Sequence, residues 1–350
     1  ELRGQATQVS IHFFRQLSPG IKAGYRMELC LTLRDIRDAL ERIQDDVHRT
    51  PVLTCATINK LSGLELHFKA EIFQKSGAFK IRGALNAVKL VPEAEAAMGV
   101  ITHSSGNHGG ALALAAQMCG IPATVVVPRG TPSCKVDAIR GYGADAVFCE
   151  PTMDGRESRC SELARSTGAT FIHPYDPRVI AGQGTIALEL LEQVADLEAV
   201  VVPVSGGGMI SGISVAAKAL RPGIKVIAAE PTGRNDAADV LRSKEAGELV
   251  LCDKPDTIAD GLQGRLGSNT WPIVRELVDA VVPVAEDEIL RAMRLCYERM
   301  KVVVEPSGAV GLAAALSSRF PMPRGSRVGV VLCGGNVDLA GKGVWELWGT

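Results

Sequence analysis

One lysine stands out because apolar residues and glycines surround it. Lys80 lies between Phe79 and Ile81. Gly77 and Gly83 lie three residues away on either side. Burial lowers the pKa of a lysine and leaves part of it neutral, which is the form that attacks aldehydes. These neighbours favour an amine held in a pocket. A helix-start lysine with its stem along an apolar surface is the alternative.

Glycine-rich turns follow three of the apolar runs that predict strands. These turns are SGNHGG (105–110), SGGGMISG (205–212) and GGN (334–336). Successive backbone N–H groups at a helix start form an anion site, and glycine allows close backbone approach. We therefore interpret the SGGG turn as a cup for a single phosphate, because a tight turn alone poorly explains three successive glycines. The dinucleotide spacing G-x-G-x-x-G fails, since position 211 is a serine.

The elements that must position these residues alternate between strands and helices from residue 64 onward. Strands are predicted at 66–70, 99–104, 123–128, 144–149, 170–174, 199–204, 225–230, 279–284 and 328–333. Most are separated by segments long enough for a helix. This alternation predicts an α/β fold in which helices cover both faces of parallel sheets. Ligands bind such sheets beyond the carboxyl ends of the strands, where the glycine turns lie.

The composition is that of a globular protein with enough core for two lobes. The chain has 350 residues, 46% of them hydrophobic, and a net charge of −1. This balance argues against nucleic-acid and anionic-membrane partners. No apolar run approaches the ~20 residues that a membrane-spanning helix needs. Nine cysteines without a C-x-x-C pair predict free thiols in a reducing compartment, and hence a cytoplasmic protein.

The N-terminal segment differs from the rest. Residues 1–26 carry four basic residues and one acidic residue, so we treat 1–28 as a leader outside the fold. It is either a transit-like segment, which would imply an organelle, or a disordered one. An amphipathic helix is predicted directly after it, with Thr32 and Asp35 at capping-box spacing.

A pocket lysine and a phosphate cup together suggest pyridoxal phosphate, whose aldehyde forms a Schiff base with lysine. Five stretches, in order, resemble the serine racemase and serine/threonine dehydratase family of fold-type II pyridoxal-phosphate enzymes. They are SGAFKIRGA, THSSGNHGG, the SGGG turn, EPSGAVGLAA (305–314) and LCGGNVDL (332–339). The resemblance spans about residues 29 to 343.

The resemblance implies a fold similar to that of the tryptophan synthase β chain. Two interleaved open-sheet domains with helices on both faces are expected. The large cofactor domain would comprise 29–98 and 177–350, and the small substrate domain would comprise 99–176. A homodimer is also implied.

The resemblance also assigns site residues. Lys80 would hold the cofactor and act as acid–base group on one face of the substrate Cα, and Ser105 would act on the other face. The implied cofactor contacts are Phe79, Lys80, Asn107, Gly206, Gly207, Gly208, Met209 and Cys333. The implied substrate contacts are Ser104, Ser105, Asn107, His108 and Arg156. Cys333 would face the pyridine nitrogen, where serine is usual. Taken singly, each polar residue is better explained by a turn or a helix cap, and only the set in matching order favours the functional interpretation.

The activity implied is pyridoxal-phosphate-dependent interconversion of L- and D-serine, accompanied by β-elimination of serine to pyruvate and ammonia. Bacterial threonine dehydratases typically carry alanine where Ser105 stands, so Ser105 favours racemisation. A dedicated L-serine/L-threonine or 3-hydroxyaspartate dehydratase is the alternative, and a cofactor carrier without turnover is a rival of another class. Gly264 and Tyr175 replace a serine and an asparagine that are common in animal racemases. They leave the choice among serine, threonine and a β-hydroxyaspartate open.

Two further sites rest on the resemblance alone. Glu230, Asp236 and the carbonyl of Arg234 match a divalent-metal site that suits Mg²⁺, Ca²⁺ or Mn²⁺. Without the family, the two acids would be interpreted as surface residues near a turn. The positions that match an activating ATP site at the dimer interface of animal relatives are Lys75, Ser76, Tyr142 and Asn336.

Overall fold

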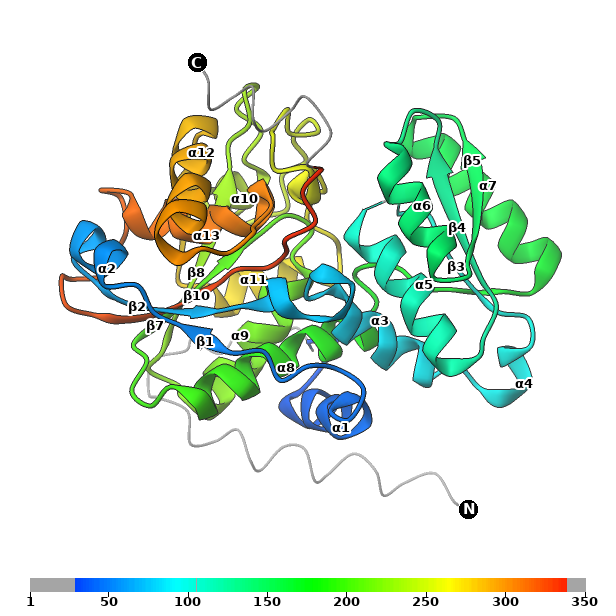
Figure 1. Ribbon diagram of the computed structural model, residues 1–350, viewed down its shortest axis with the longest axis horizontal. Helices are drawn as coiled ribbons and strands as arrows, with labels where there is room; N and C mark the ends of the chain where they lie inside the picture. The colour runs from blue at the N-terminus through cyan, green and yellow to red at the C-terminus, as the bar shows by residue number, and fades with distance from the viewer. Residues whose placement is uncertain (1–28, 105, 339–350) are drawn as a thin grey trace.

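The computed structural model describes residues 29–104 and 106–338, which form two lobes around two sheets (Figure 1). The predicted leader, 1–28, and Ser105 lie outside the described residues. The six-stranded sheet has the order β1 (Val52–Leu53), β2 (Glu65–Lys69), β10 (Arg327–Val331), β7 (Ala199–Pro203), β8 (Lys225–Pro231) and β9 (Ala280–Val284). The four-stranded sheet has the order β5 (Asp145–Cys149), β4 (Ala123–Pro128), β3 (Val100–Thr102) and β6 (Thr170–Phe171).

The nine predicted strands are confirmed within three residues at each end. The prediction of parallel pairing is confirmed for all of them. Strand β1 was not predicted, and it pairs antiparallel with β2 at the sheet edge. Its two residues are too few to show a hydrophobic period.

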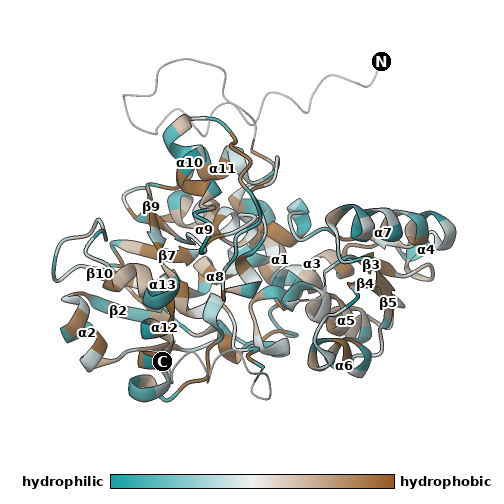
Figure 2. Ribbon diagram, turned by 90° about the horizontal axis from the view of Figure 1, so that it is seen from above, coloured by the Kyte–Doolittle hydropathy of each residue, from teal (hydrophilic) through white to brown (hydrophobic). Residues whose placement is uncertain are grey.

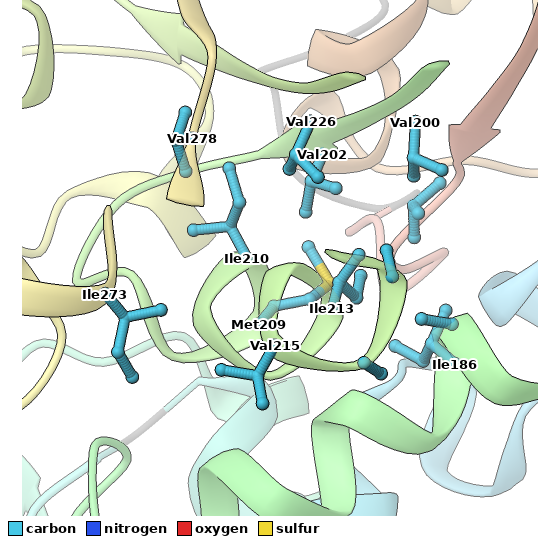
Figure 3. Close-up of a cluster of buried hydrophobic side chains, with 14 of the residues drawn as sticks. Ile186, Val200, Val202, Met209, Ile210, Ile213, Val215, Val226, Ile273 and Val278 are labelled. Carbon is cyan, nitrogen blue, oxygen red and sulfur yellow. The ribbon is translucent and has the colours of Figure 1, made fainter. Parts of the chain in front are cut away.

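Helices cover both faces of the large sheet, which is why its central strands are apolar throughout. Alternate residues of β7 face opposite sides. Val200 and Val202 pack with α8 (Pro177–Gln193), α9 (Gly208–Leu220) and α11 (Trp271–Leu277). Figure 3 shows Met209, Ile210 and Ile213 of α9 in this layer. Val201 instead packs with α12 (Glu286–Leu295) and α13 (Pro306–Leu316).

The small sheet is covered in the same way. Val125 and Val127 of β4 pack with α5 (Asn107–Cys119) and α6 (Ser133–Gly141). Val126 faces the other side, in a cluster with Cys160 of α7 (Met153–Thr167). Figure 2 shows the strands of this sheet in hydrophobic brown beside the largely hydrophilic α7. Shorter helices complete the fold: α2 (Ala56–Ser62), α4 (Glu93–Ala96) and α10 (Asp239–Ala246).

Two elements join the lobes. Helix α1 (Leu33–Ile43) begins at the predicted capping box of Thr32 and Asp35 and packs on α3 (Lys80–Lys89) and α8. Helix α3 contacts both α5 of the small lobe and α8 of the large lobe. Strands β3 to β6 all fall inside the predicted small domain, 99–176, but the assignment of α3 to one domain stays a prediction.

A buried ionic cluster fixes the start of α3. The guanidinium of Arg82 is fully buried and bonds the carboxylates of Glu71 (2.8 Å) and Glu189 (2.6 Å). The Lys69 amine bonds the same Glu189 carboxylate over 2.6 Å. Because buried charges are tolerated only when paired, this cluster ties α3 rigidly to β2 and α8 two residues beyond Lys80.

Two further features of the fold are the lengths of its helices and the state of its cysteines. Within the described ranges, no helix is both long and apolar enough to cross a bilayer. All nine cysteines lie in those ranges, and each is a free thiol.

Candidate active site

Lys80 is the first residue of α3, and its amine lies close enough to Cys333 and Glu305 for both to act on its charge. The Nζ atom lies 4.9 Å from the centroid of the Phe79 ring. Burial of the amine lowers its pKa to about 8, although Cys333 and Glu305 act in the opposite direction. Phe79 itself is fixed because its backbone N–H donates to the carbonyl of Cys333 over 3.0 Å. This arrangement fits the predicted pocket lysine, with a substantial neutral fraction near pH 8.

The SGGG turn forms an open helix N-terminus, as predicted. Gly207 has φ of 85°, a left-handed conformation that favours glycine, and α9 begins at the next residue. Among the residues that the structure describes, no side chain caps the helix. The hydroxyl of Thr270 donates to the carbonyl of Gly206 over 2.7 Å and fixes the turn. The uncapped N–H groups and the helix dipole suit a phosphate.

The loop after β3 places Asn107 at the first turn of α5. Gly109 is required there, since a Cβ atom would lie 1.8 Å from the carbonyl oxygen of Ser104. The side-chain amide of Asn107 is held at both ends. Its Nδ2 donates to Glu305 over 2.8 Å, and its Oδ1 accepts from Nδ2 of Asn336 over 2.9 Å. The amide is therefore oriented by the protein before any ligand binds.

Glu305 is a buried acid that no role was predicted for. It is 3% exposed, and its second oxygen accepts the N–H of Asn336 over 3.1 Å. Burial raises the pKa of this carboxyl to about 8. The sequence held one signal of this burial: Glu305 lies between an apolar run and a proline that starts a helix, and such a position is buried. Glu305 therefore belongs to the site through Asn107 and its nearness to Lys80.

His108 and Arg156 lie on the small-lobe side. The His108 ring is buried beside the carbonyl of Ile172 at 3.2 Å, and burial lowers its pKa to about 3. The ring is therefore neutral at physiological pH. Arg156 of α7 acts electrostatically on His103, next to Ser104. Its Nε is buried without a hydrogen-bond partner in the described part of the chain, which suits a site for an anion.

Cys333 lies two residues beyond the end of β10, near Lys80 and Glu305. Its thiol is 3% exposed and donates to the carbonyl of Ser307 over 3.4 Å. Burial, with Glu305 nearby, raises the pKa of the thiol well above its usual range. The group is therefore a neutral thiol, as the resemblance required.

The predicted metal ligands are only partly assembled. Both carboxylate oxygens of Glu230 accept backbone N–H groups at the start of α10, from Val240 (2.8 Å) and Leu241 (2.9 Å). Burial raises the pKa of Glu230, and the adjoining Asp239 adds to this. Asp236 is exposed and pairs with Arg242 over 2.7 Å.

Arg234 is the third residue of the predicted metal site, and its own polar contacts are made with Asp256. Its N–H and its guanidinium bond the carbonyl and the carboxylate of Asp256 over 2.8 and 2.9 Å. Among the residues that the structure describes, no group of three or more His, Cys, Asp or Glu side chains forms a ready metal cage.

Asp239 is a second acid that the sequence did not single out. Its carboxylate accepts the N–H of Leu266 over 2.9 Å. The side chain of Leu266 packs against Gly207, where a Cβ atom would lie 3.0 Å away. A chain of contacts thus runs from Glu230 through Asp239 to the SGGG turn.

The predicted nucleotide residues are brought together in part. Asn336 Nδ2 donates to the carbonyl of Ser76 over 2.8 Å, and the Ser76 hydroxyl is buried without a described partner. Lys75 precedes Ser76 in a short 3₁₀ turn, Lys75–Gly77. Tyr142 lies at the end of α6 and packs on the apolar cluster of the small lobe.

Comparisons with known proteins match this geometry. The family model described as "Pyridoxal-phosphate dependent enzyme" matches residues 43–334. A serine racemase of Arabidopsis thaliana is 52% identical over 326 residues, which cover 92% of this chain and 97% of that protein. The structure of maize serine racemase is similar, with a TM-score of 0.86 and 46% identity over 91% of this chain and 96% of that one. The structure of a T.th. threonine deaminase has a TM-score of 0.83 and 42% identity, over 89% and 100%.

Proposed function

The chain belongs to the pyridoxal-phosphate dependent enzymes, and we propose that it is a serine racemase that also eliminates serine to pyruvate and ammonia. The observation that carries the proposal is the Lys80 amine, which is buried with a pKa of about 8 in a fold that also presents the uncapped amides of α9. An amine and an anion cup are the two groups that an aldehyde with a phosphate requires. The choice of serine rests on the 52% identity to a serine racemase along nearly the whole chain.

Pyridoxal phosphate, when bound, supplies the aldehyde that captures an amine and the electron sink that makes the Cα proton of an amino acid acidic. The residues proposed to hold it are Phe79, Lys80, Asn107, Gly206, Gly207, Gly208, Met209 and Cys333. The amides of the SGGG turn would receive the phosphate, and the pre-oriented amide of Asn107 would donate to the phenolic oxygen.

The proton chemistry is assigned to two side chains. Lys80 would remove and return the Cα proton on one face, because its lowered pKa makes the amine a competent base near neutrality. Ser105 would exchange a proton on the opposite face. Racemisation requires both groups, whereas elimination requires only Lys80 and a leaving hydroxyl.

The substrate carboxylate is assigned to the loop that starts α5 and to the small lobe. Ser104, Ser105, Asn107 and His108 would supply donors to it. The buried, unpartnered Nε of Arg156 supports a second contact from α7. Because the His108 ring is neutral, it adds no charge to the site.

Cys333 sets the balance between the two reactions. A neutral thiol cannot hold the pyridine nitrogen protonated as a carboxylate would. Opposite this thiol the bound cofactor would be a weaker electron sink, so elimination of the β-hydroxyl would compete with return of the proton. We therefore expect pyruvate beside D-serine.

A dedicated dehydratase of L-serine or L-threonine is the second candidate. The similarity to threonine deaminase, with a TM-score of 0.83, favours it. It would use Lys80 in the same way and would not need Ser105. The preferred amino acid and the product formed from it together distinguish the two candidates.

A divalent cation is proposed to bind at Glu230, the carbonyl of Arg234 and Asp236. Two carboxylates and a carbonyl suit Mg²⁺, Ca²⁺ or Mn²⁺ in their donor chemistry. Glu230 itself is paired with no cation among the described residues, and its burial raises its pKa. Arg242 would have to release Asp236 first. Through Asp239 and Leu266 the cation would stabilise the SGGG turn.

Three further proposals concern the oligomeric state, an activating nucleotide and the cellular compartment. We propose a homodimer activated by ATP at Lys75, Ser76, Tyr142 and Asn336. The buried, unpartnered hydroxyl of Ser76 beside Asn336 supports a ligand there. Mass measurement with and without ATP tests this. The nine free thiols support a cytoplasmic location, which fractionation tests.

The domain division, 29–98 with 177–350 and 99–176, is proposed to allow closure over the substrate. The lobes meet through the Asn107–Glu305 hydrogen bond and through an ion pair between Lys135 of α6 and Asp260. Limited proteolysis with and without substrate tests the division, since closure should protect the connections.

The test of the main proposal is turnover by the purified protein with pyridoxal phosphate and Mg²⁺. L-serine and L-threonine are supplied separately, and D-serine, pyruvate and 2-oxobutyrate are quantified. The proposal expects D-serine and pyruvate from serine, with little turnover of threonine, and neither product with Lys80→Ala. Turnover of threonine to 2-oxobutyrate without any D-serine would support the dehydratase instead.

A further inference from the structure

The ring of Tyr175 lies against a set of glycines at the SGGG turn. A Cβ atom on Gly206 would lie 1.7 Å from the phenol oxygen of Tyr175, so only glycine fits there. A Cβ atom on Gly267 would lie 2.8 Å from the ring, and one on Gly208 3.8 Å from it. The phenol ring therefore forms a wall of the turn.

Gly264 completes this wall from another segment of the chain. A Cβ atom on Gly264 would lie 2.8 Å from the Tyr175 oxygen and 2.9 Å from the hydroxyl oxygen of Ser205. Contacts under 3.0 Å force a neighbour to move. The large side chain at 175 and the missing side chain at 264 are therefore one feature, although they are 89 positions apart in the sequence.

The backbone around Tyr175 keeps the ring in place. The N–H of Tyr175 donates to Nδ1 of His173 over 3.0 Å, and its carbonyl accepts from the Asn269 amide over 3.1 Å. The His173 ring packs edge-on at 4.7 Å between ring centroids. A ring held on these sides can hardly swing away to admit a side chain at Gly264.

Two hydroxyl groups converge at this wall. The oxygens of Tyr175 and Ser205 lie within 2.9 Å of the point where the Gly264 Cβ would stand, and the N–H nitrogen of Gly206 lies 3.7 Å from it. Neither hydroxyl has a hydrogen-bond partner among the described residues. Burial raises the pKa of the Tyr175 phenol to about 12, so it stays protonated and can donate.

We propose that Tyr175 and Gly264 are a size-matched pair that shapes the phosphate cup, with the Tyr175 hydroxyl donating to the cofactor phosphate beside the Gly206 amide. This inference rests on the proposed function, since it assumes that the SGGG turn binds the phosphate of pyridoxal phosphate. Tyr175 is a positioning residue here, and it takes no part in proton transfer.

The test measures cofactor occupancy, which does not depend on turnover. Each holoenzyme is equilibrated over a range of free pyridoxal phosphate, and bound cofactor is followed by absorbance. The series is repeated with pyridoxal, which lacks the phosphate. Tyr175→Phe should weaken pyridoxal phosphate binding about 10- to 150-fold, the value of a hydrogen bond to a charged group. Pyridoxal binding should change less than twofold.

The pairing is tested by a double-mutant cycle. In the wild-type background, Gly264→Ser should weaken pyridoxal phosphate binding at least tenfold, because serine meets the phenol. In the Tyr175→Asn background, the same substitution should cost less than twofold. Gly223→Ser is the matched control, since a Cβ atom there meets nothing within 4 Å and the residue is exposed.

Two results would overturn the pairing and the phosphate role. An equal cost of Gly264→Ser in both backgrounds excludes the pairing. The hydroxyl contact is excluded if Tyr175→Phe binds pyridoxal phosphate and pyridoxal like wild type, or loses both equally. Tyr175→Phe therefore tests the phosphate role even if Gly264→Ser does not fold. A wild-type protein that binds no pyridoxal phosphate would refute the proposed function itself, which is a distinguishable outcome.

Discussion

The side-chain amide of Asn107 donates to the carboxyl of Glu305 over 2.8 Å, between residues 198 positions apart in the chain. Asn107 starts α5 in the small lobe, and Glu305 precedes α13 in the large lobe. The bond therefore links the two lobes at the site and orients the amide proposed to contact the cofactor. Its strength depends on the protonation of a fully buried acid.

Glu305 should make the folded protein less stable as the pH rises. Its pKa is raised from 4.5 to about 8 in the folded state, so the folded protein holds a proton that the unfolded chain has lost. The stabilising contribution is complete below pH 4.5 and is lost progressively as the pH rises to about 8. Thermal unfolding at about pH 5, about pH 6.5 and about pH 8 should therefore show a falling Tm.

Glu305→Gln should flatten that pH dependence, because glutamine is shaped like the protonated acid and cannot ionise. The exposed Glu192→Gln, which removes a surface pair with Arg49, is the control and should leave the slope unchanged. An identical slope in wild type and Glu305→Gln would contradict the assignment.

Lys80 should capture the cofactor with a pH profile centred near 8. Burial lowers its pKa from 10.5 to about 8, so the neutral amine accumulates as the pH rises and is nearly complete by about pH 9. The rate of covalent capture by the cofactor-free protein, followed by stopped-flow absorbance, should rise about tenfold per pH unit below 8 and then level off. A rate still rising at about pH 10 would indicate an unperturbed lysine. Lys80→Met should form no covalent adduct.

Cys333→Ser should tighten cofactor binding about 3- to 10-fold, because a hydroxyl makes a better hydrogen bond than a thiol, worth about 0.5–1.5 kcal/mol. Equilibrium occupancy of the holoenzyme measures this. Cys296→Ser is the matched control, since Cys296 is also fully buried but lies in the core at the C-terminal end of α12. Weaker cofactor binding in Cys333→Ser would show that the thiol does not face the ring nitrogen.

Mg²⁺ should raise the Tm of the protein through Asp236. Asp236→Asn should weaken the apparent Mg²⁺ affinity at least tenfold, because it removes a charged ligand. Arg242→Met should tighten it a few-fold, since Arg242 competes for the same carboxylate. Asp287→Asn, which breaks an exposed pair with Arg291, serves as the control. Unchanged Mg²⁺ affinity in Asp236→Asn would place the cation elsewhere or exclude it.

Local pattern was enough to predict most of the fold. The parallel strands are buried on both faces, so their apolar runs are continuous and easy to see, as in 199–203. The cap of α1 and the open turn before α9 are set by neighbouring residues, and both were predicted. The two-residue strand β1 was missed, because its position depends on pairing with β2 and not on its own sequence.

The site was predictable only where residues form motifs. Lys80 and the SGGG turn could be recognised from the residues next to them in the sequence. Glu305 and Asp239 act through partners far away in the chain, Asn107 and Leu266, and a single sequence does not reveal such pairs. Tyr175 and Gly264 were each noticed as departures from a pattern, but only the structure shows that one makes room for the other.

The central claim is that Lys80 and Ser105 exchange protons on opposite faces of the substrate Cα. The most direct measurement follows D-serine and pyruvate side by side from L-serine in D₂O, with wild type and Ser105→Ala. We expect wild type to form deuterated D-serine and pyruvate, and Ser105→Ala to lose D-serine formation at least about 100-fold while pyruvate formation persists. Equal formation of D-serine by both proteins, or pyruvate alone from both, would contradict it.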